Sequence, residues 1–322
     1  MAFLRFWRHA TIIALALALA ACAGVQKVEY VTGTSARNLV QITATPGIDI
    51  YPAVSPDGAQ IAYQRRHEEH YDLWVVDNKT GRGLCKITNH TGDDRNPAWF
   101  PDGETLVFDS PRLGAFSLWR KKVVGPGGIS QITGAASMDF DGSPSPLDGR
   151  IVFTSQNAEE ALTRRHEGMA WELFLEDMPH IWMVDPDGSN LTQFGEGFSP
   201  TWSPDGNSIA FVSLKSKNCD VWLMEANGGK LRRLTTHKAV DVDPSFSPDG
   251  SMVAFASDRR GSGGSRDFNV WVISVDGKSK TQITIDEAYD GGCCWSPDGD
   301  IYFHSNRGGD WDIWRITPVF GS

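Results

Sequence analysis

The sequence has few cysteines and no excess of basic residues, and each shortage excludes a class of protein. Its five cysteines lack the paired spacings of a four-cysteine zinc site. Cys293 and Cys294 are adjacent, which allows either a strained vicinal disulfide or two small buried residues. The chain has 30 lysines and arginines against 40 aspartates and glutamates, a net charge of −10. Because phosphate binding needs clustered basic residues, we do not expect a nucleic-acid partner.

Motifs of common hydrolases are also missing. The chain contains neither Gly-x-Ser-x-Gly nor His-Glu-x-x-His. Residues 67–70 hold two histidines three positions apart, which is not the spacing of a zinc-binding helix, and we interpret them as a solvated charged loop. The sequence therefore favours a binding protein over an enzyme.

A long hydrophobic run occurs at the N-terminus. Arg5 and Arg8 precede an apolar run at residues 12–21, which is the layout of a secretory signal peptide and too short for a membrane anchor. The run ends in Leu-Ala-Ala-Cys at Cys22, which resembles the lipobox of bacterial lipoproteins. That resemblance implies cleavage before Cys22, lipidation of Cys22 and, with Ala23 next, sorting to the outer membrane of a Gram-negative cell. The alternative is an ordinary signal peptide with an incidental cysteine.

The sequence divides into three segments. We expect residues 1–21 to be the signal peptide, residues 22–35 to be the lipidated Cys22 with a polar tether, and residues 36–320 to be one domain. Removing residues 1–21, which hold two arginines and no acid, leaves a net charge of −12.

A turn containing Asp-Gly recurs six times between short alternating strands. The six aspartates are separated by 45, 46, 57, 44 and 49 residues: Asp57, Asp102, Asp148, Asp205, Asp249 and Asp298. Each turn is followed by a strand that carries a tryptophan, and five of the six units then show a Gln-Ile-Thr-like strand. A period near 45 with four strands per repeat is typical of the blades of a β-propeller.

The two chain ends complement each other. The sixth repeat ends near Pro318 without a fourth strand, whereas residues 37–43 form an unassigned strand before the first repeat. We predict an all-β fold, a six-bladed β-propeller whose ring is closed when this N-terminal strand completes the last blade.

Nine tryptophans recur in register. Each of the six repeats has one in its third strand, and three repeats have another before the turn. A residue required in every blade is most simply explained by packing between blades, with an aromatic ligand platform as the alternative. The nine are Trp74, Trp99, Trp119, Trp182, Trp202, Trp222, Trp271, Trp295 and Trp314. The turn aspartates are likewise expected to cap their own turns.

The motif Pro-x-Trp-Ser-Pro-Asp-Gly, followed by Asp-x-Trp, resembles the propeller repeat of TolB, the periplasmic component of the Tol–Pal envelope system. It is also similar to the propellers of prolyl oligopeptidase-type and tricorn-type proteases. The resemblance covers nearly the whole mature chain and implies a TolB-like propeller. TolB carries an N-terminal α/β domain for which this chain leaves no room, and TolB is soluble, so we expect a TolB-like lipoprotein.

Strand direction places the loops before each first strand on one face, together with the loops between the second and third strands. On this face we predict that five aspartates crowd the mouth of the central channel: Asp49, Asp94, Asp141, Asp241 and Asp290. Close carboxylates raise one another's pKa or recruit a cation such as Ca²⁺. The alternative is that each aspartate caps a turn and faces water. We place His90 on the same face.

The third blade carries a long connection at residues 156–179, which accounts for the interval of 57 residues. Trp171 and Phe174 lie on an apolar side of this segment, and long loops on rigid scaffolds often carry function. We interpret the segment as a contact for a partner; the alternative is an insertion that packs on its own blade.

These observations predict a non-catalytic, monomeric propeller that is anchored to the cell envelope on its periplasmic side. We expect it to bind an envelope protein or peptide through the channel-mouth face, with a possible link to Tol–Pal-type processes implied by the resemblance. The alternative is a propeller enzyme, a lyase or lactonase that uses a metal at the channel mouth.

Overall fold

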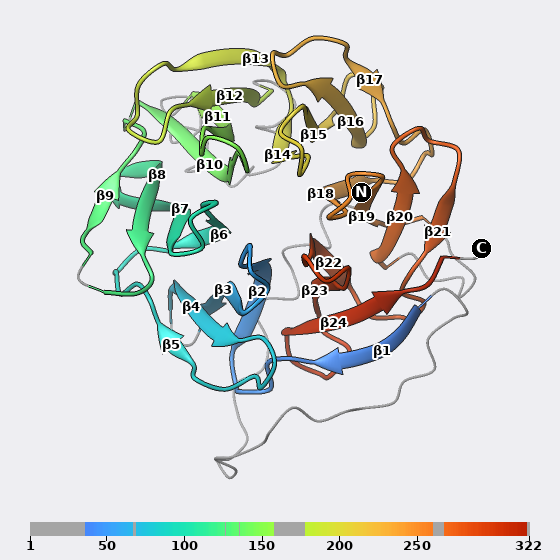
Figure 1. The fold of residues 1–322 in the computed structure, drawn as a ribbon, viewed down its shortest axis with the longest axis horizontal. Helices are drawn as coiled ribbons and strands as arrows, with labels where there is room; N and C mark the ends of the chain where they lie inside the picture. The colour runs from blue at the N-terminus through green and yellow to red at the C-terminus, as the bar shows by residue number, and fades with distance from the viewer. Residues whose placement is uncertain are drawn as a thin grey trace.

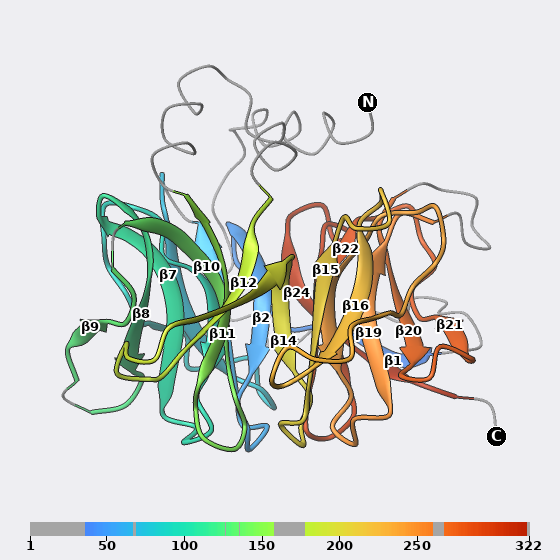
Figure 2. The same cartoon turned by 90° about the horizontal axis from the view of Figure 1, so that it is seen from above.

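The computed structural model describes residues 36–66, 69–125, 127–134, 136–157, 178–259 and 267–320. In these residues 24 strands form six four-stranded antiparallel sheets, arranged as blades around a common axis (Figure 1). Seen from the side, the blades make a disc (Figure 2). The predicted six-bladed β-propeller is confirmed. Within these same residues, no helix has the length and apolar character needed to cross a membrane.

Each blade runs from an inner strand at the axis to an outer strand at the rim. The first blade consists of β2 (Ile48–Val54), β3 (Gln60–Arg66), β4 (Tyr71–Asp77) and β5 (Cys85–Lys86). The second consists of β6 (Arg95–Trp99), β7 (Thr105–Leu113), β8 (Ala115–Lys122) and β9 (Ile129–Gln131). The third consists of β10 (Ser137–Pro144), β11 (Ile151–Asn157), β12 (His180–Val184) and β13 (Thr192–Glu196).

The remaining three blades follow the same plan. The fourth consists of β14 (Phe198–Trp202), β15 (Ser208–Ser213), β16 (Asp220–Glu225) and β17 (Arg232–Arg233). The fifth consists of β18 (Asp241–Phe246), β19 (Met252–Ser257), β20 (Asn269–Ser274) and β21 (Lys280–Gln282). The sixth consists of β22 (Asp290–Trp295), β23 (Ile301–Ser305), β24 (Asp312–Pro318) and the N-terminal β1 (Ala36–Gln41).

β1 occupies the outer edge of the sixth blade, in the position that the spacing predicted. It pairs antiparallel with β24, with Val40 opposite Arg315 and Gln41 opposite Trp314. The Ile42 N–H donates to the Ile313 carbonyl at 2.8 Å and extends the pairing beyond the strand. The last sheet therefore joins strands from both ends of the described chain.

The Asp-Gly turns hold the inner hairpins together. In the fourth blade the Ser203 hydroxyl donates to Asp205 Oδ1 at 2.6 Å, and the Asn207 N–H donates to the same oxygen at 3.0 Å. Gly206 has a φ of +67°, a conformation that glycine adopts at little cost. The predicted capping role is confirmed at five of the six turns, where the aspartate accepts a backbone N–H of its own turn: Asp57, Asp102, Asp148, Asp205 and Asp249.

The core is divided into six apolar clusters, and each cluster lies between neighbouring blades. Trp202, for example, packs with Val152 and Phe211 between the third and fourth blades. All nine repeat tryptophans belong to these clusters or pack against them, which confirms that they fill the wedges between blades.

A cavity lies between the fourth and fifth blades. Its volume is about 320 Å³, and its lining includes Leu223, Phe246 and Val275 together with Asp205 and Asp249 of the Asp-Gly turns. Phe246 stands where the fourth and sixth blades carry Trp202 and Trp295.

Candidate functional site

The two faces of the disc carry different loops. The Asp-Gly turns lie on one face (Figure 2). The other face carries the loops that enter each inner strand and those that join the second and third strands of a blade. We keep the name channel-mouth face for this second surface, where inner strands begin at or directly after Asp94, Asp241 and Asp290.

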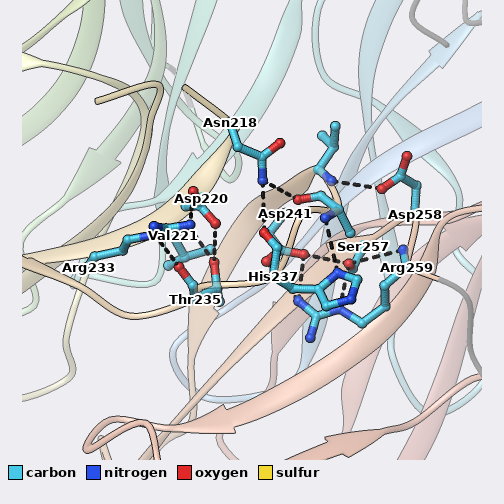
Figure 3. A network of polar contacts seen from close by, with 12 residues as sticks. Asn218, Asp220, Val221, Arg233, Thr235, His237, Asp241, Ser257, Asp258 and Arg259 are labelled. Carbon is cyan, nitrogen blue, oxygen red and sulfur yellow. Dashed lines mark hydrogen bonds and ion pairs between the residues drawn. The ribbon is translucent and has the colours of Figure 1, made fainter. Parts of the chain in front are cut away.

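Three of the predicted carboxylates are buried and paired with arginines. Asp94, Asp241 and Asp290 expose none of their side chains. Both oxygens of Asp241 accept from Arg259 at 2.7 Å (Figure 3), and Asp94 accepts from Arg112 in the same way at 2.6 Å. In the sixth blade, Arg307 donates to Asp290 at 2.6 Å.

The arginine of each pair also stacks on aromatic rings of its own blade. The Arg259 guanidinium lies 4.8 Å from the Trp271 ring centroid and 5.2 Å from that of Phe255. Arg112 and Arg307 occupy equivalent places over their own phenylalanine and tryptophan. The aspartate, arginine and two rings make one repeated unit, which we call the buried staple.

The buried staple removes these carboxylates from the predicted cation site. Desolvation raises the pKa of Asp241 and raises that of Asp290 to about 6, while the neighbouring arginine opposes the rise in each case. Across the described ranges, no three His, Cys, Asp or Glu side chains gather closely enough to hold a metal ion. The prediction that five carboxylates share a cation does not hold for Asp94, Asp241 and Asp290, because arginines neutralise these three inside their blades.

Asp49 departs from this pattern. Arg65 approaches it only to 3.7 Å and instead donates to the Pro46 carbonyl at 2.7 Å. Burial raises the pKa of Asp49 to about 7. Asp312 lies nearby where β1 meets β24, and burial raises its pKa to about 6 although Thr43 and Gln41 donate to it.

Asp141 does not occupy the place that the sequence spacing gave it. Asp139 lies opposite Ser155 in the third blade, as Asp241 lies opposite Ser257 in the fifth, so Asp139 is the true equivalent. Pro144 lies opposite Ile151, as Val54 lies opposite Ile61 in the first blade, so Pro144 stands two residues beyond the place of Pro52. Counting from Pro144 therefore selected the wrong aspartate.

Asp141 belongs instead to a ring of six residues around the axis, one from each inner strand. All six have a positive φ between 49° and 59° at a bulge in that strand: Tyr51, Asn96, Asp141, Ser199, Asp243 and Gly292. We call this set the axial ring. Only glycine adopts such a φ without strain, so the fold holds five other residues in a costly conformation to place their side chains at the axis.

Side chains of the second strands fasten the axial ring from blade to blade. The Asn96 N–H donates to Gln64 Oε1 at 2.8 Å, and the Ser199 N–H donates to Thr154 Oγ1 at 3.0 Å. The Tyr51 N–H donates to His304 Nδ1 at 3.3 Å. Each of these bonds joins the inner strand of one blade to the blade before it.

The axial ring holds two carboxylates, and the charge of Asp243 acts on Asp141. Asp141 accepts from Asn96 Nδ2 at 2.9 Å and from Ser199 Oγ at 3.2 Å. Desolvation and then the charge of Asp243 raise the pKa of Asp141 to about 6. Burial also raises the pKa of Asp243, one oxygen of which accepts the Gly292 N–H at 3.0 Å.

Beside the axial ring lies a cluster of aromatic rings around His304. The Tyr51 ring lies 5.0 Å from that of His304, and the Tyr289 ring stacks parallel to His304 at 6.0 Å. Trp311 meets Tyr289 edge-on at 5.3 Å and His304 at 5.5 Å. We call these four residues the mouth cluster. His304 is 4% exposed, whereas Tyr51, Tyr289 and Trp311 are only partly buried.

The predicted histidines have local roles where they are described. His90 Nδ1 accepts the Gly92 N–H at 2.9 Å, and His237 Nδ1 accepts the Ala239 N–H at 3.0 Å (Figure 3). Each therefore caps the loop that enters the next blade. Cys22, Trp171 and Phe174 lie outside the described residues. Cys293 and Cys294 are free thiols, without the disulfide that their adjacency allowed.

Sequence reasoning missed the axial ring and the mouth cluster. The ring has a recognisable signal, because its members directly precede the inner-strand proline in four repeats, as in Tyr51-Pro52 and Asp243-Pro244. The buried staple has one as well, since a Ser-x-Arg motif ends the second strand of three blades. His304, Tyr289 and Trp311 are not part of the recurring motifs; they lie in or beside the strands of the sixth blade, and the fold brings them together with Tyr51 of the first blade.

The axial ring, the packing between blades and the repeat pattern define the protein as a six-bladed β-propeller. A family model described as the TolB beta propeller domain matches residues 23–169 and 163–266. The chain belongs to this family.

Sequence similarity to individual relatives is local. The Tol-Pal system protein TolB of Thioalkalivibrio sulfidiphilus is 27% identical over 121 residues, which are 36% of this chain and 26% of that protein. The matched segments of the TolB sequences thus span about a quarter of their length or less, down to 11%.

Solved structures show the same fold over most of the chain. A putative TolB from Agrobacterium tumefaciens superposes with a TM-score of 0.60 at 19% identity, covering 88% of this chain and 94% of that one. An oligogalacturonate lyase from Vibrio parahaemolyticus gives a TM-score of 0.59 at 13% identity, covering 91% and 97%. At these identities the likeness establishes the fold alone.

Proposed function

We propose that the protein is a non-catalytic propeller that binds a protein or peptide partner through its channel-mouth face. The observation that carries the proposal is the mouth cluster. Tyr51, Tyr289 and Trp311 are partly exposed there, although the repeat tryptophans pack between the blades. Tyrosine and tryptophan are enriched in protein interfaces, because they combine a large apolar surface with a polar tip.

A place on the periplasmic side of the cell envelope is part of the proposal. Membership of the TolB propeller family supports it, and so does the similarity to proteins named for the Tol-Pal system. The proposal also includes a signal peptide at residues 1–21, lipidation of Cys22 and sorting to the outer membrane. We further propose that the protein acts as a monomer. Metabolic labelling with a palmitate analogue tests the anchor, because Cys22→Ala should remove the label.

The alternative, a propeller enzyme, is supported by the fold that the chain shares with the oligogalacturonate lyase. Against it, three of the carboxylates that would bind a metal are held in buried staples, and His90 caps a loop. Turnover of uronides or sugar lactones with added divalent metal tests this alternative. Activity that disappears in Asp94→Asn, with the fold intact, would favour it over a binding protein.

The partner-binding proposal is tested by affinity capture from envelope extracts. Four baits are compared: the intact chain, a deletion of residues 156–179, Trp311→Ala, and Ser251→Ala on the turn face as the control. We expect Trp311→Ala to lose a protein that the intact chain and the control retain. The deletion shows whether the segment around Trp171 and Phe174 contributes to binding the captured protein. Loss of the protein with Ser251→Ala alone would overturn the assignment of the face.

A further inference from the structure

The buried staple shows how this chain holds a guanidinium group. In the fifth blade, Asp241 supplies the negative charge, Trp271 and Phe255 supply the aromatic faces, and Arg259 fills the space between them. The same composition recurs in the second and sixth blades. An aspartate beside two aromatic rings is thus a cation site that the fold builds repeatedly.

The channel-mouth face presents this composition once more. Asp243 of the axial ring lies beside the mouth cluster, because its Oδ2 accepts the Gly292 N–H at 3.0 Å and a Cβ on Gly292 would lie 3.2 Å from the Tyr51 ring. Its negative charge also contributes to raising the pKa of both Tyr51 and Tyr289. Tyr51, Tyr289 and Trp311 provide the rings. In the described part of the chain no arginine or lysine is paired with Asp243, whose charge is opposed only by the Gly292 N–H.

His304 keeps the mouth cluster uncharged. Its Nδ1 accepts the Tyr51 N–H, and burial lowers its pKa to about 3, so the imidazole is neutral at physiological pH. A protonated histidine here would repel a cation. The neutral ring instead supports Tyr289 by stacking at 6.0 Å.

Nearby charged groups also favour the binding of a cation at the mouth cluster. Asp141 lies on the same axial ring and its charge also acts on Tyr51, while Arg95 is the one basic group that opposes these charges at Tyr51. Arg95 is itself paired with Asp93. The corner therefore combines a net negative charge with partly exposed aromatic rings.

From this juxtaposition, and resting on the proposed function, we propose that Asp243, Tyr51, Tyr289 and Trp311 bind an arginine or lysine side chain of the partner. The cation would lie against the aromatic faces with its charge toward Asp243, as Arg259 lies toward Asp241. Arginine suits the site better than lysine, because a planar guanidinium stacks on rings and pairs with a carboxylate at the same time. The partner class is thus a protein or peptide with an exposed basic residue in its binding segment.

The test uses a short probe in place of the unidentified partner. The full chain is titrated with the capped peptide acetyl-Gly-Arg-Gly-amide and, separately, with the same peptide carrying citrulline, which has the shape of arginine without the charge. The Trp311 indole N–H resonance reports binding, and Trp311→Phe identifies that resonance by its loss. We expect the arginine peptide to bind about tenfold more tightly than the citrulline peptide.

Two variants separate the charge from the rings. Asp243→Asn keeps an oxygen for the Gly292 N–H and removes only the charge, so it should weaken the arginine peptide about tenfold and leave the citrulline peptide unchanged. Tyr289→Leu removes an aromatic face and should weaken the arginine peptide by a similar factor. Asp205→Asn on the turn face is the control and should have no effect.

Equal binding of the two peptides, no binding of the arginine peptide, or an unaffected Asp243→Asn would each overturn the inference. The proposed function can fail separately. If affinity capture still depends on Trp311 while the arginine peptide does not bind, partner binding at this face stands and only the cationic chemistry is wrong. If neither experiment shows binding, both are wrong.

Discussion

Replacing Arg259 by methionine should destabilise the protein strongly, because it leaves the buried Asp241 without its partner. Arg259 is 4% exposed and Asp241 is fully buried, and the pair shares two hydrogen bonds of 2.7 Å. Breaking a buried pair by removing one member costs about 3 to 5 kcal/mol in other proteins. Arg259→Met also loses the contacts with Trp271 and Phe255, although the methionine side chain retains part of that packing.

The cost translates into a fall of about 5 to 10 °C in the unfolding midpoint for a domain of this size. Thermal unfolding followed by circular dichroism measures it. Arg150→Met is the matched control, because Arg150 and its partner Asp148 are 39% and 45% exposed and such a surface pair contributes below about 1 kcal/mol. The double variant Asp241→Asn/Arg259→Met should recover part of the loss, since no uncompensated charge remains.

The deficit of Arg259→Met should also depend on pH. Without the arginine, burial raises the pKa of Asp241 further above its unfolded value, so the variant gains stability as the pH falls and loses it as the pH rises. A deficit no larger than that of Arg150→Met, or one that does not change with pH, would refute the view that these aspartates are neutralised inside the blades.

Three further predictions concern other parts of the propeller. The pKa of Asp49 is raised to about 7 and those of Asp141, Asp290 and Asp312 to about 6, so their contribution to stability is complete below about pH 4 and is lost as the pH rises through 6 to 7. His304, with its pKa lowered to about 3, acts in the opposite direction as the pH falls below about 6.5, but the four carboxylates outweigh it. The unfolding midpoint measured by calorimetry should therefore fall from about pH 5 to pH 7.5, less steeply in Asp141→Asn. Phe246→Trp should occupy part of the cavity of about 320 Å³ that Phe246 lines and stabilise the protein by about 1 kcal/mol in urea unfolding; a loss of stability would mean that the cavity does not accept the larger ring. Gly292→Ala should lower the free energy of unfolding by about 2 kcal/mol more than Gly299→Ala. Both glycines have a positive φ, but only at Gly292 would the new Cβ meet His304 Nδ1, at 2.5 Å. Equal losses would show that the His304 imidazole moves aside.

The fold could be predicted from the sequence because every blade repeats its own signals. The Asp-Gly turn recurs six times at intervals of 44 to 57 residues, each time followed by a strand with a tryptophan, so counting the turns gives the number of blades and the direction of each strand. The spare strand at residues 37–43 had one open edge to pair with, which is where β1 lies.

The site could be predicted only in part, because its chemistry depends on contacts across blades. The carboxylates of Asp94 and Asp241 were assigned to the correct face, but their arginines follow 18 residues later, and the Ser-x-Arg motif that carries them meets the aspartate only when the hairpin is folded. Asp141 was chosen because Pro144 stands two residues beyond the place that Pro52 has in the first blade. His304, Tyr289 and Trp311 all lie in or beside the strands of the sixth blade, and they meet Tyr51 of the first blade only in the folded ring.

Site-specific photocrosslinking in cells tests the central claim, that the channel-mouth face binds the partner. A photoreactive amino acid replaces Trp311 in one strain and Ser251, on the turn face, in another. The account predicts a discrete crosslinked protein from position 311 that weakens when Asp243→Asn is added, and none from position 251. A discrete crosslinked protein from position 251, with none from position 311, would contradict it.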